Sequence, residues 1–315
     1  MHPLEDQEPA THSTERPSIL GVATDLTDMG RLIPHAMAQA RRANAAVCLI
    51  HALNIPDDML LSRHGKGCDK ADRADARTKL KAASQQLQAG GVPCSIVLER
   101  GVAAEIILEA VHAAHASRLI VETHRHGSSG QKILGSVANA LFRTVTVPIF
   151  IVGPTVPETF SRLDPVRILH PVSLGGNFRI SAGLAMCLAK EYDAELILLH
   201  VVDPAILRGS FVNEILARKN RELEALKAED QRGTSIRTIV SCGNTIQEMF
   251  RVCVLTECDW IVMGIERDFP WWSKTNSAAY QVIAQSKCPV VVMRETHAQL
   301  PVACLHHLAE AALRS

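Results

Sequence analysis

The chain has 315 residues, 47% of them hydrophobic and 21% charged, which suggests two domains or one large one with a sizeable core. Lysine plus arginine equals aspartate plus glutamate at 33 each, which argues against a general attraction to nucleic acid or to an anionic membrane. No apolar run approaches the roughly 18–20 residues that a membrane-spanning helix needs.

The N-terminal segment and the cysteines indicate the compartment. Residues 1–17 are polar and lack the basic-then-apolar pattern of a signal peptide, so we expect a disordered tail on a cytoplasmic protein. The nine cysteines are scattered and form no Cys-x-x-Cys pair. We interpret them as buried free thiols in a reducing compartment, without a disulfide framework or a metal cluster.

Short apolar runs alternate with longer amphipathic segments in the first half of the chain. The runs expected to be strands are 18–24, 45–53, 93–100, 118–122 and 147–152. The segments expected to be helices are 28–44, 69–88, 103–116 and 135–144. Strands separated by helices of this length require parallel β-α-β crossovers.

The same series of elements then repeats. The corresponding segments are 166–172, 182–202, 237–253, 259–264 and 287–293. Two landmarks support the repeat, since His200 follows His51 by 149 residues and Pro289 follows Pro148 by 141. We therefore expect two α/β domains, 18–153 and 166–293, joined by a proline-bearing linker, 154–165. Residues 294–315 are expected to be a tail that contains a candidate short helix.

Three segments of the first copy resemble the universal stress protein (UspA) family. They are "ILGVATDLTDMGRLIPHAMAQARRANAAVCLIHAL", the turn at Gly101, and "LGSVANALFRTVTVPIFIV". The resemblance covers about residues 18–153 and 166–293. It implies a Rossmann-like α/β fold of the adenine-nucleotide-hydrolase type, with two tandem open parallel sheets of five strands flanked by helices. The edge of each sheet needs a cover. The two copies can provide it as an intramolecular pseudo-dimer, and a homodimer is the alternative.

The loop after the fourth strand determines whether a nucleotide fits. ATP-binding members of the family have Gly, two residues, Gly, nine residues and then Gly-Ser or Gly-Thr, and the loop amides receive the phosphates. In this chain Gly135 and Ser136 match the end of that pattern, whereas Glu122 and Arg125 replace the other two glycines. A carboxylate at position 122 would repel phosphate, and Arg125 could neutralise it.

The candidate site lies in the first copy, and its expected cofactor is ATP. The resemblance places Asp25 and Val47 near the nucleoside; the alternative for Asp25 is a carboxylate that interacts with a helix N-terminus. Gly127 and Gly130 are assigned to the phosphates from the loop composition alone, because they fall inside the family's nine-residue spacer. The candidate binding residues are Asp25, Val47, Arg125, Gly127, Gly130, Gly135 and Ser136.

The second copy is degenerate. Ser173 stands at the place of Asp25, and the loop from Gly264 carries Trp271 and Trp272, as in members of the family that do not bind ATP. We expect no nucleotide there. Trp271 and Trp272 are assigned to helix packing, with an interaction patch as the alternative.

Other conspicuous residues receive structural assignments. Trp260 lies in an apolar strand and is predicted to be core. His51 and His200 are predicted to satisfy backbone groups at strand ends. The remaining histidines provide no convergent metal-ligand set, and "GSSG" at 127–130 is neither a Walker A loop nor a hydrolase elbow. No residue is assigned a catalytic role.

The sequence therefore predicts a non-catalytic universal stress protein with a degenerate ATP-type site in the first copy and none in the second. Two alternatives remain open. One is a slow ATPase or nucleotide-sensing regulator, and the other is a purely structural protein-interaction module. An adenine nucleotide and a protein partner of undefined identity are the expected ligands, and nucleic acid and membrane are not.

Overall fold

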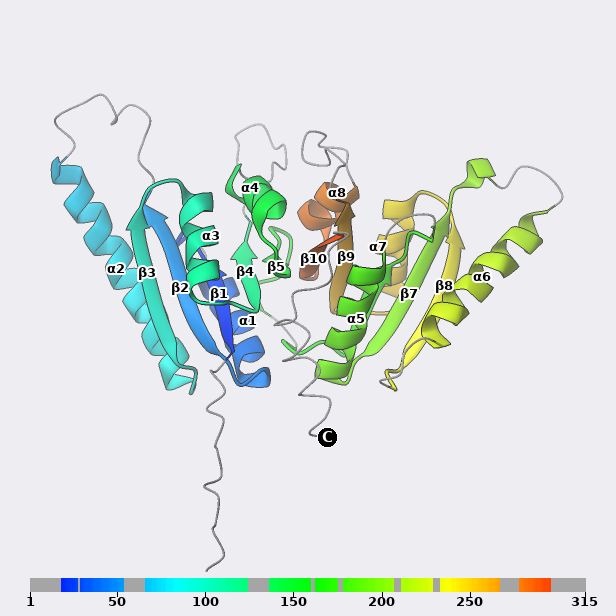
Figure 1. Cartoon of the computed structure of the whole chain (residues 1–315), viewed down its shortest axis with the longest axis horizontal. Coiled ribbons are helices and arrows are strands. Elements are labelled where there is room, and N and C mark those ends of the chain that lie inside the picture. The colour runs from blue at the N-terminus through cyan, green and yellow to red at the C-terminus, as the bar shows by residue number, and fades with distance from the viewer. Residues whose placement is uncertain are drawn as a thin grey trace, which may run out of the picture.

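The structure is a computed structural model that describes residues 18–27, 29–53, 66–123, 136–159, 162–174, 178–206, 211–228, 233–266 and 278–295. Strands and helices alternate through these ranges (Figure 1). The strands of the first half are β1 (Ile19–Ala23), β2 (Ala46–Leu53), β3 (Cys94–Arg100), β4 (Arg118–Glu122) and β5 (Ile149–Val152). Its helices are α1 (Met29–Arg42), α2 (Lys66–Ala89), α3 (Ala103–Ala113) and α4 (Ser136–Thr144).

The second half repeats this order. Its strands are β6 (Arg167–Pro171), β7 (Glu195–Val202), β8 (Ile236–Cys242), β9 (Trp260–Glu266) and β10 (Val290–Glu295). Its helices are α5 (Arg179–Tyr192), the short 3₁₀ helix η2 (Pro204–Ile206), α6 (Val212–Ala228), α7 (Thr245–Leu255) and α8 (Ala278–Gln285). Helix α6 lies in a segment for which no element was predicted from the sequence. Strand β10 also continues two residues into the stretch that was expected to be the tail.

The ten strands form one continuous sheet in the order β3-β2-β1-β4-β5-β10-β9-β6-β7-β8 (Figure 1). Each half is a five-stranded parallel sheet. The halves join antiparallel through β5 and β10, with Ile151 opposite Val290 and Ile149 opposite Val292. Each half thus pairs with the edge strand of the other half, which would otherwise expose a row of unpaired backbone N–H and C=O groups.

Helices cover both faces of this sheet, which is why its central strands are almost entirely apolar. One core cluster includes Leu32 of α1 and Leu188 of α5. The cluster on the other face includes Leu141 of α4 and Val282 of α8. Both clusters contain residues of both halves, so the hydrophobic core extends across the junction between β5 and β10.

The segment expected to be a linker is fixed to both halves at its beginning. Gly153, directly after β5, leaves room for α8, because a Cβ atom there would lie 2.8 Å from the carbonyl oxygen of Ile283. Arg31 of α1 donates to the carbonyl oxygens of Gly153 at 3.2 Å and Val156 at 3.4 Å. The Thr155 hydroxyl donates to the carbonyl oxygen of Ser286 at 2.5 Å. The first residues of this segment are therefore part of the packed structure.

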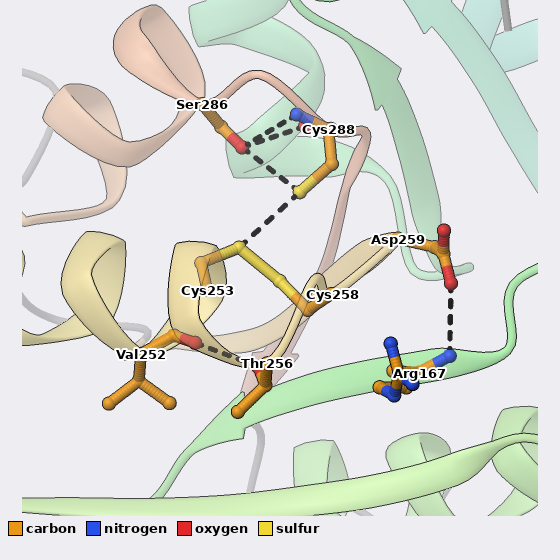
Figure 2. The surroundings of a disulfide bond; sticks show 8 residues. All are labelled: Arg167, Val252, Cys253, Thr256, Cys258, Asp259, Ser286 and Cys288. Atoms are coloured by element: carbon orange, nitrogen blue, oxygen red, sulfur yellow. Dashed lines mark hydrogen bonds between the residues drawn. A yellow bond between two sulfur atoms is a disulfide. The ribbon is translucent and has the colours of Figure 1, made fainter. Parts of the chain in front are cut away.

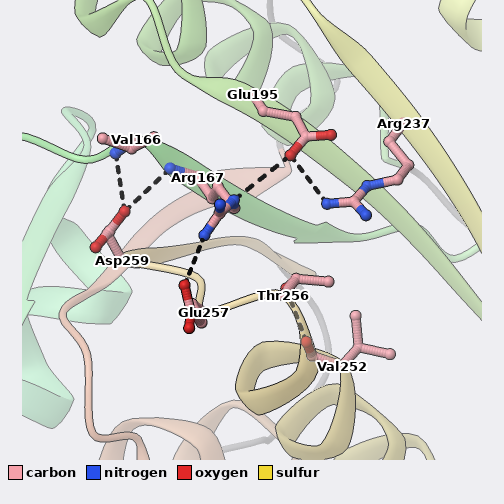
Figure 3. A network of polar contacts seen from close by, with 8 residues as sticks. All are labelled: Val166, Arg167, Glu195, Arg237, Val252, Thr256, Glu257 and Asp259. Carbon is pink, nitrogen blue, oxygen red and sulfur yellow. Dashed lines mark hydrogen bonds and ion pairs between the residues drawn. The ribbon is translucent and has the colours of Figure 1, made fainter.

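A polar network fixes the start of β6 (Figure 3). One carboxylate oxygen of Asp259 accepts the backbone N–H groups of Val166 at 2.8 Å and Arg167 at 3.0 Å. Arg167 and Arg237 both lie beside the Glu195 carboxylate, at 3.7 and 2.9 Å. Such partly exposed ion pairs contribute little stability individually. The backbone bonds to Asp259 are the part of the network that aligns β6 with β9.

The expectation that every cysteine is a free thiol is wrong for one pair. Cys253 and Cys258 form a disulfide (Figure 2). Helix α7 ends at Leu255 and the chain turns back, so that the N–H of Cys258 donates to the carbonyl oxygen of Cys253 at 3.0 Å. This turn brings the two Cα atoms to 5.0 Å, within the range that a disulfide requires. The free cysteines in the described part of the chain are Cys48, Cys94, Cys187, Cys242 and Cys288.

A histidine is buried in the second half at a position that is apolar in the first. His170 is 0% exposed on β6, and the strand register equates it with Val22 on β1. Its Nδ1 donates to the carbonyl oxygen of Val262 at 2.8 Å, and Nε2 has no hydrogen-bond partner among the described residues. Burial lowers the pKa of His170 from 6.5 to about 4, so the ring is neutral in the folded protein near neutral pH.

This burial predicts a loss of stability in mild acid. The unfolded chain protonates His170 near pH 6.5 and the folded protein only near pH 4, so the free energy of unfolding should fall as the pH drops from about 6.5 to about 4. The contribution is up to about 3 kcal/mol. Urea denaturation of wild type and His170→Val across this range measures it. The variant should show a smaller loss on acidification, whereas the exposed substitution His112→Gln should leave the wild-type profile unchanged. Equal slopes for wild type and His170→Val would contradict this assignment.

Candidate functional site

The candidate site lies where the strand order of the first half reverses. From β1 the chain first builds β2 and β3 on one side and then crosses to place β4 on the other. Ligands of open parallel sheets bind at such a switch point, beside the carboxyl ends of the strands. Thr24 and Asp25 follow β1 at this edge, and Glu122 ends β4 beside them.

Asp25 lies exposed in a tight turn between β1 and α1. Its Oδ1 accepts the backbone N–H of Thr27 at 2.9 Å and also the Thr27 hydroxyl. Leu26 has a φ of 70°, and its N–H donates to the Thr24 hydroxyl at 2.9 Å. An aspartate that accepts a bond from two residues further on stabilises a turn of this kind. The Asp25 carboxylate therefore has a local structural role and a fixed position at the edge of the sheet.

A hydrogen bond bridges the switch point next to Asp25. The hydroxyl of Thr24, which is 8% exposed, donates to Oε1 of Glu122 at 2.7 Å. Glu122 is the residue that replaces the first glycine of the family's phosphate loop. Repulsion between this carboxylate and phosphate was expected from the sequence, whereas its partner Thr24 was not. The parallel register of Ala23 with Val121 brings Thr24 next to Glu122, and no local pattern in the sequence contains that register.

The histidines at the ends of the second strands have the same role in both halves. Nδ1 of His51 lies 2.8 Å from the carbonyl oxygen of Thr24, and Nδ1 of His200 lies 2.8 Å from that of Val172. Since a carbonyl oxygen only accepts, each ring donates through Nδ1. The prediction that these histidines satisfy backbone groups at strand ends is confirmed. In the first half this bond also fixes the backbone directly before Asp25.

Of the remaining predicted residues, the structure describes Val47 and Ser136. Val47 is the second residue of β2 and lies in the core at 1% exposure, so its side chain has no open surface at the carboxyl edge, where β2 ends at Leu53. Ser136 is the first residue of α4. The other candidate residues lie outside the described ranges; they are Arg125, Gly127, Gly130 and Gly135.

The equivalent edge of the second half differs in chemistry. The strand register equates Arg118 with Trp260 and hence Glu122 with Gly264. Val172, which is buried, takes the place of Thr24, and exposed Ser173 takes the place of Asp25. Trp260 is 1% exposed, which confirms its prediction as a core residue. Trp271 and Trp272 lie outside the described part of the chain.

Comparisons with known proteins agree with this architecture. The model of the universal stress protein family matches residues 18–153 and 180–294. A universal stress protein from Archaeoglobus fulgidus DSM 4304 superposes with a TM-score of 0.66 at 16% identity, covering 88% of this chain and 98% of that one. A putative universal stress protein from Pseudomonas aeruginosa UCBPP-PA14 gives a TM-score of 0.63 at 16% identity, covering 94% and 98%. At these identities the likeness establishes the fold alone.

No curated protein is significantly similar to the chain in sequence. None of the helices in the described ranges combines the length and the apolar character that crossing a membrane requires. The two matches of the family model together cover most of the residues between positions 18 and 294. The chain therefore belongs to the universal stress protein family.

Proposed function

We propose that this universal stress protein is a non-catalytic binding protein that holds an adenine nucleotide at the switch point of its first half and none in its second. The observation that carries the proposal is the exposed Asp25 carboxylate, held by Thr27 at the carboxyl end of β1, where the second half has Ser173. A carboxylate at this edge can accept hydrogen bonds from ribose hydroxyl groups.

The two ends of a nucleotide fit this edge unequally. The nucleoside end fits, because Asp25 is exposed and already oriented. The phosphate end meets the carboxylate of Glu122, which Thr24 holds at the switch point through a bond of 2.7 Å. Like charges that lie close together repel by an amount that depends on solvent screening. We therefore infer weak binding, with Arg125, Gly135 and Ser136 as the proposed phosphate ligands. Val47 is left out of the proposal because its side chain is buried.

Glu122→Gln is expected to tighten ATP binding about tenfold, since removing one repulsive charge near the phosphates is worth about 1.4 kcal/mol. The glutamine keeps an oxygen that can accept the Thr24 hydroxyl, so the turn should remain intact. Adenosine, which has no phosphate, should bind wild type and variant equally. Calorimetric titration of the full chain with ATP and with adenosine measures both affinities.

Asp25→Asn tests the nucleoside contact separately from the phosphate contact, because it should weaken the binding of ATP and of adenosine alike. Ser173→Ala, at the equivalent place in the second half, is the matched control and should change neither affinity. If neither wild type nor Glu122→Gln binds ATP or adenosine at millimolar concentration, the proposal fails and a pure interaction module becomes the better account. Metal-dependent release of phosphate from ATP would instead favour the slow ATPase.

A further inference from the structure

Three cysteine sulfur atoms of the second half converge on one point. Cys253 lies in the last turn of α7, Cys258 lies two positions before β9, and Cys288 lies two positions before β10 (Figure 2). The three sulfur atoms lie within 4.8 Å of one another, and those of Cys253 and Cys288 are 3.8 Å apart. Cys253 and Cys258 share a disulfide, and Cys288 is the free thiol beside it.

Hydrogen bonds fix the segments that carry these sulfur atoms. Ser286, which is 1% exposed, donates through its hydroxyl to the carbonyl oxygen of Cys288 at 2.8 Å and accepts the N–H of Cys288 at 3.2 Å. In the turn between the other two cysteines, the Thr256 hydroxyl donates to the carbonyl oxygen of Val252 at 2.7 Å. These bonds hold the backbone of Cys288 next to the disulfide, and its Sγ also lies 3.3 Å from the hydroxyl oxygen of Ser286.

We propose that reduction of the Cys253–Cys258 disulfide opens a binding site in which the sulfur atoms of Cys253, Cys258 and Cys288 hold one thiophilic cation of the Zn²⁺ class. A Zn–S bond of about 2.3 Å and a tetrahedral angle place two thiolates about 3.8 Å apart. This is the separation found between the sulfur atoms of Cys253 and Cys288. The four residues between Cys253 and Cys258 also fall within the ligand spacing of zinc sites, about two to four residues.

The chemistry of the two states makes the site redox-gated. A dithiol reduces the disulfide to two thiols by giving two electrons and two protons and becoming a disulfide itself. A phosphine gives the two electrons and becomes a phosphine oxide, while water supplies its oxygen and the two protons. The three thiols then release three protons when they bind the cation, because the thiolate is the ligand. The fourth coordination position is left for water or an external ligand. The oxidised state offers only Cys288 and should not bind. This proposal departs from the absence of metal ligands expected from the sequence, and it is independent of nucleotide binding.

The test is a cobalt titration of the full chain, first reduced with a phosphine and then desalted without oxygen. Reduced wild type should bind one Co²⁺ per chain with sulfur-to-metal charge-transfer absorption, and Zn²⁺ should displace it. Cys288→Ser should weaken Co²⁺ binding at least about 100-fold, because removing a metal ligand lowers the affinity more than removing a residue that only contacts a ligand. Oxidised wild type should show no charge-transfer band. Absence of the band in reduced wild type, or an unchanged affinity in Cys288→Ser, would overturn the proposal.

Control variants identify which thiols bind. Cys242→Ser removes an exposed thiol on β8, away from the cluster, and should bind Co²⁺ as wild type does. Cys304→Ser is needed because Cys304, His306 and His307 lie outside the described residues and carry ligand atoms of their own. Binding that is lost in Cys304→Ser and kept in Cys288→Ser would refute the assignment. Circular dichroism checks that each variant is folded, and Cys288→Ala gives a second test without a hydroxyl.

Discussion

Trp260→Ala is expected to lower the free energy of unfolding by about 3–5 kcal/mol, the usual cost of deleting a large core aromatic. Trp260 is 1% exposed. Its ring packs edge-on against Phe150 at 5.0 Å and against Tyr192 at 4.8 Å. Because Phe150 belongs to the first half and the other two residues belong to the second, the cavity would open at the junction of the halves. Urea denaturation followed by circular dichroism measures the loss.

Conservative and exposed substitutions serve as controls for this cavity. Trp260→Phe should cost less, because it keeps an aromatic ring next to Phe150 and Tyr192. Val254→Ala, at a side chain that is 73% exposed, should change the free energy of unfolding by no more than about 0.5 kcal/mol. A loss below about 1 kcal/mol for Trp260→Ala would mean that the halves do not depend on this aromatic contact.

Arg118→Met is expected to destabilise the protein by about 3–5 kcal/mol, because it leaves a largely buried carboxylate without its cation. Arg118 of β4 donates to Oε1 of Gln39 at 2.6 Å and to Oε2 of Glu191 at 3.2 Å, so it links the two halves. The side chains of Arg118 and Glu191 are only 9% and 11% exposed. Burial alone would lower the pKa of Arg118, but Glu191 and Tyr192 raise it above its ordinary value, so the guanidinium stays charged. Guanidinium chloride denaturation measures the loss.

The double variant Arg118→Met/Glu191→Leu separates the cost of an orphaned charge from the value of the ion pair. It should recover much of the stability lost in Arg118→Met, since no buried charge then remains unpaired. The exposed pair of Lys79 and Asp75 is a matched surface control, and Lys79→Ala should cost no more than about 1 kcal/mol. If the double variant is no more stable than Arg118→Met, the loss comes from packing and not from the charge.

Local patterns in the sequence were sufficient for most of the architecture. The apolar runs predicted the five strands of the first half within two residues at each end, because a parallel strand buried on both faces must be apolar along its whole length. The repeat placed His51 and His200 at equivalent strand ends, and both make the predicted backbone contact. The core position of Trp260 also followed from its strand. The resemblance to the universal stress proteins agrees with the family match.

Other features depended on contacts between distant residues. Thr24 and Glu122 are separated by 98 positions, and only the parallel pairing of β1 with β4 brings them into contact. The partners of Arg118 could not be predicted either, because Gln39 and Glu191 lie on helices of different halves. Val47 shows the reverse case: the resemblance placed it near a nucleoside, whereas the sheet buries its side chain.

The cysteines show most clearly what the sequence alone could not determine. The sequence determined by itself that the chain is a duplicated α/β protein, because burial within each strand and helix leaves a local apolar pattern. Only the tertiary structure decided that Cys253 and Cys258 pair and that Cys288 joins them from 30 positions further along the chain. The three sulfur atoms converge only when α7, β9 and β10 are in place, because the distance between side chains depends on how these elements pack and not on their spacing along the chain.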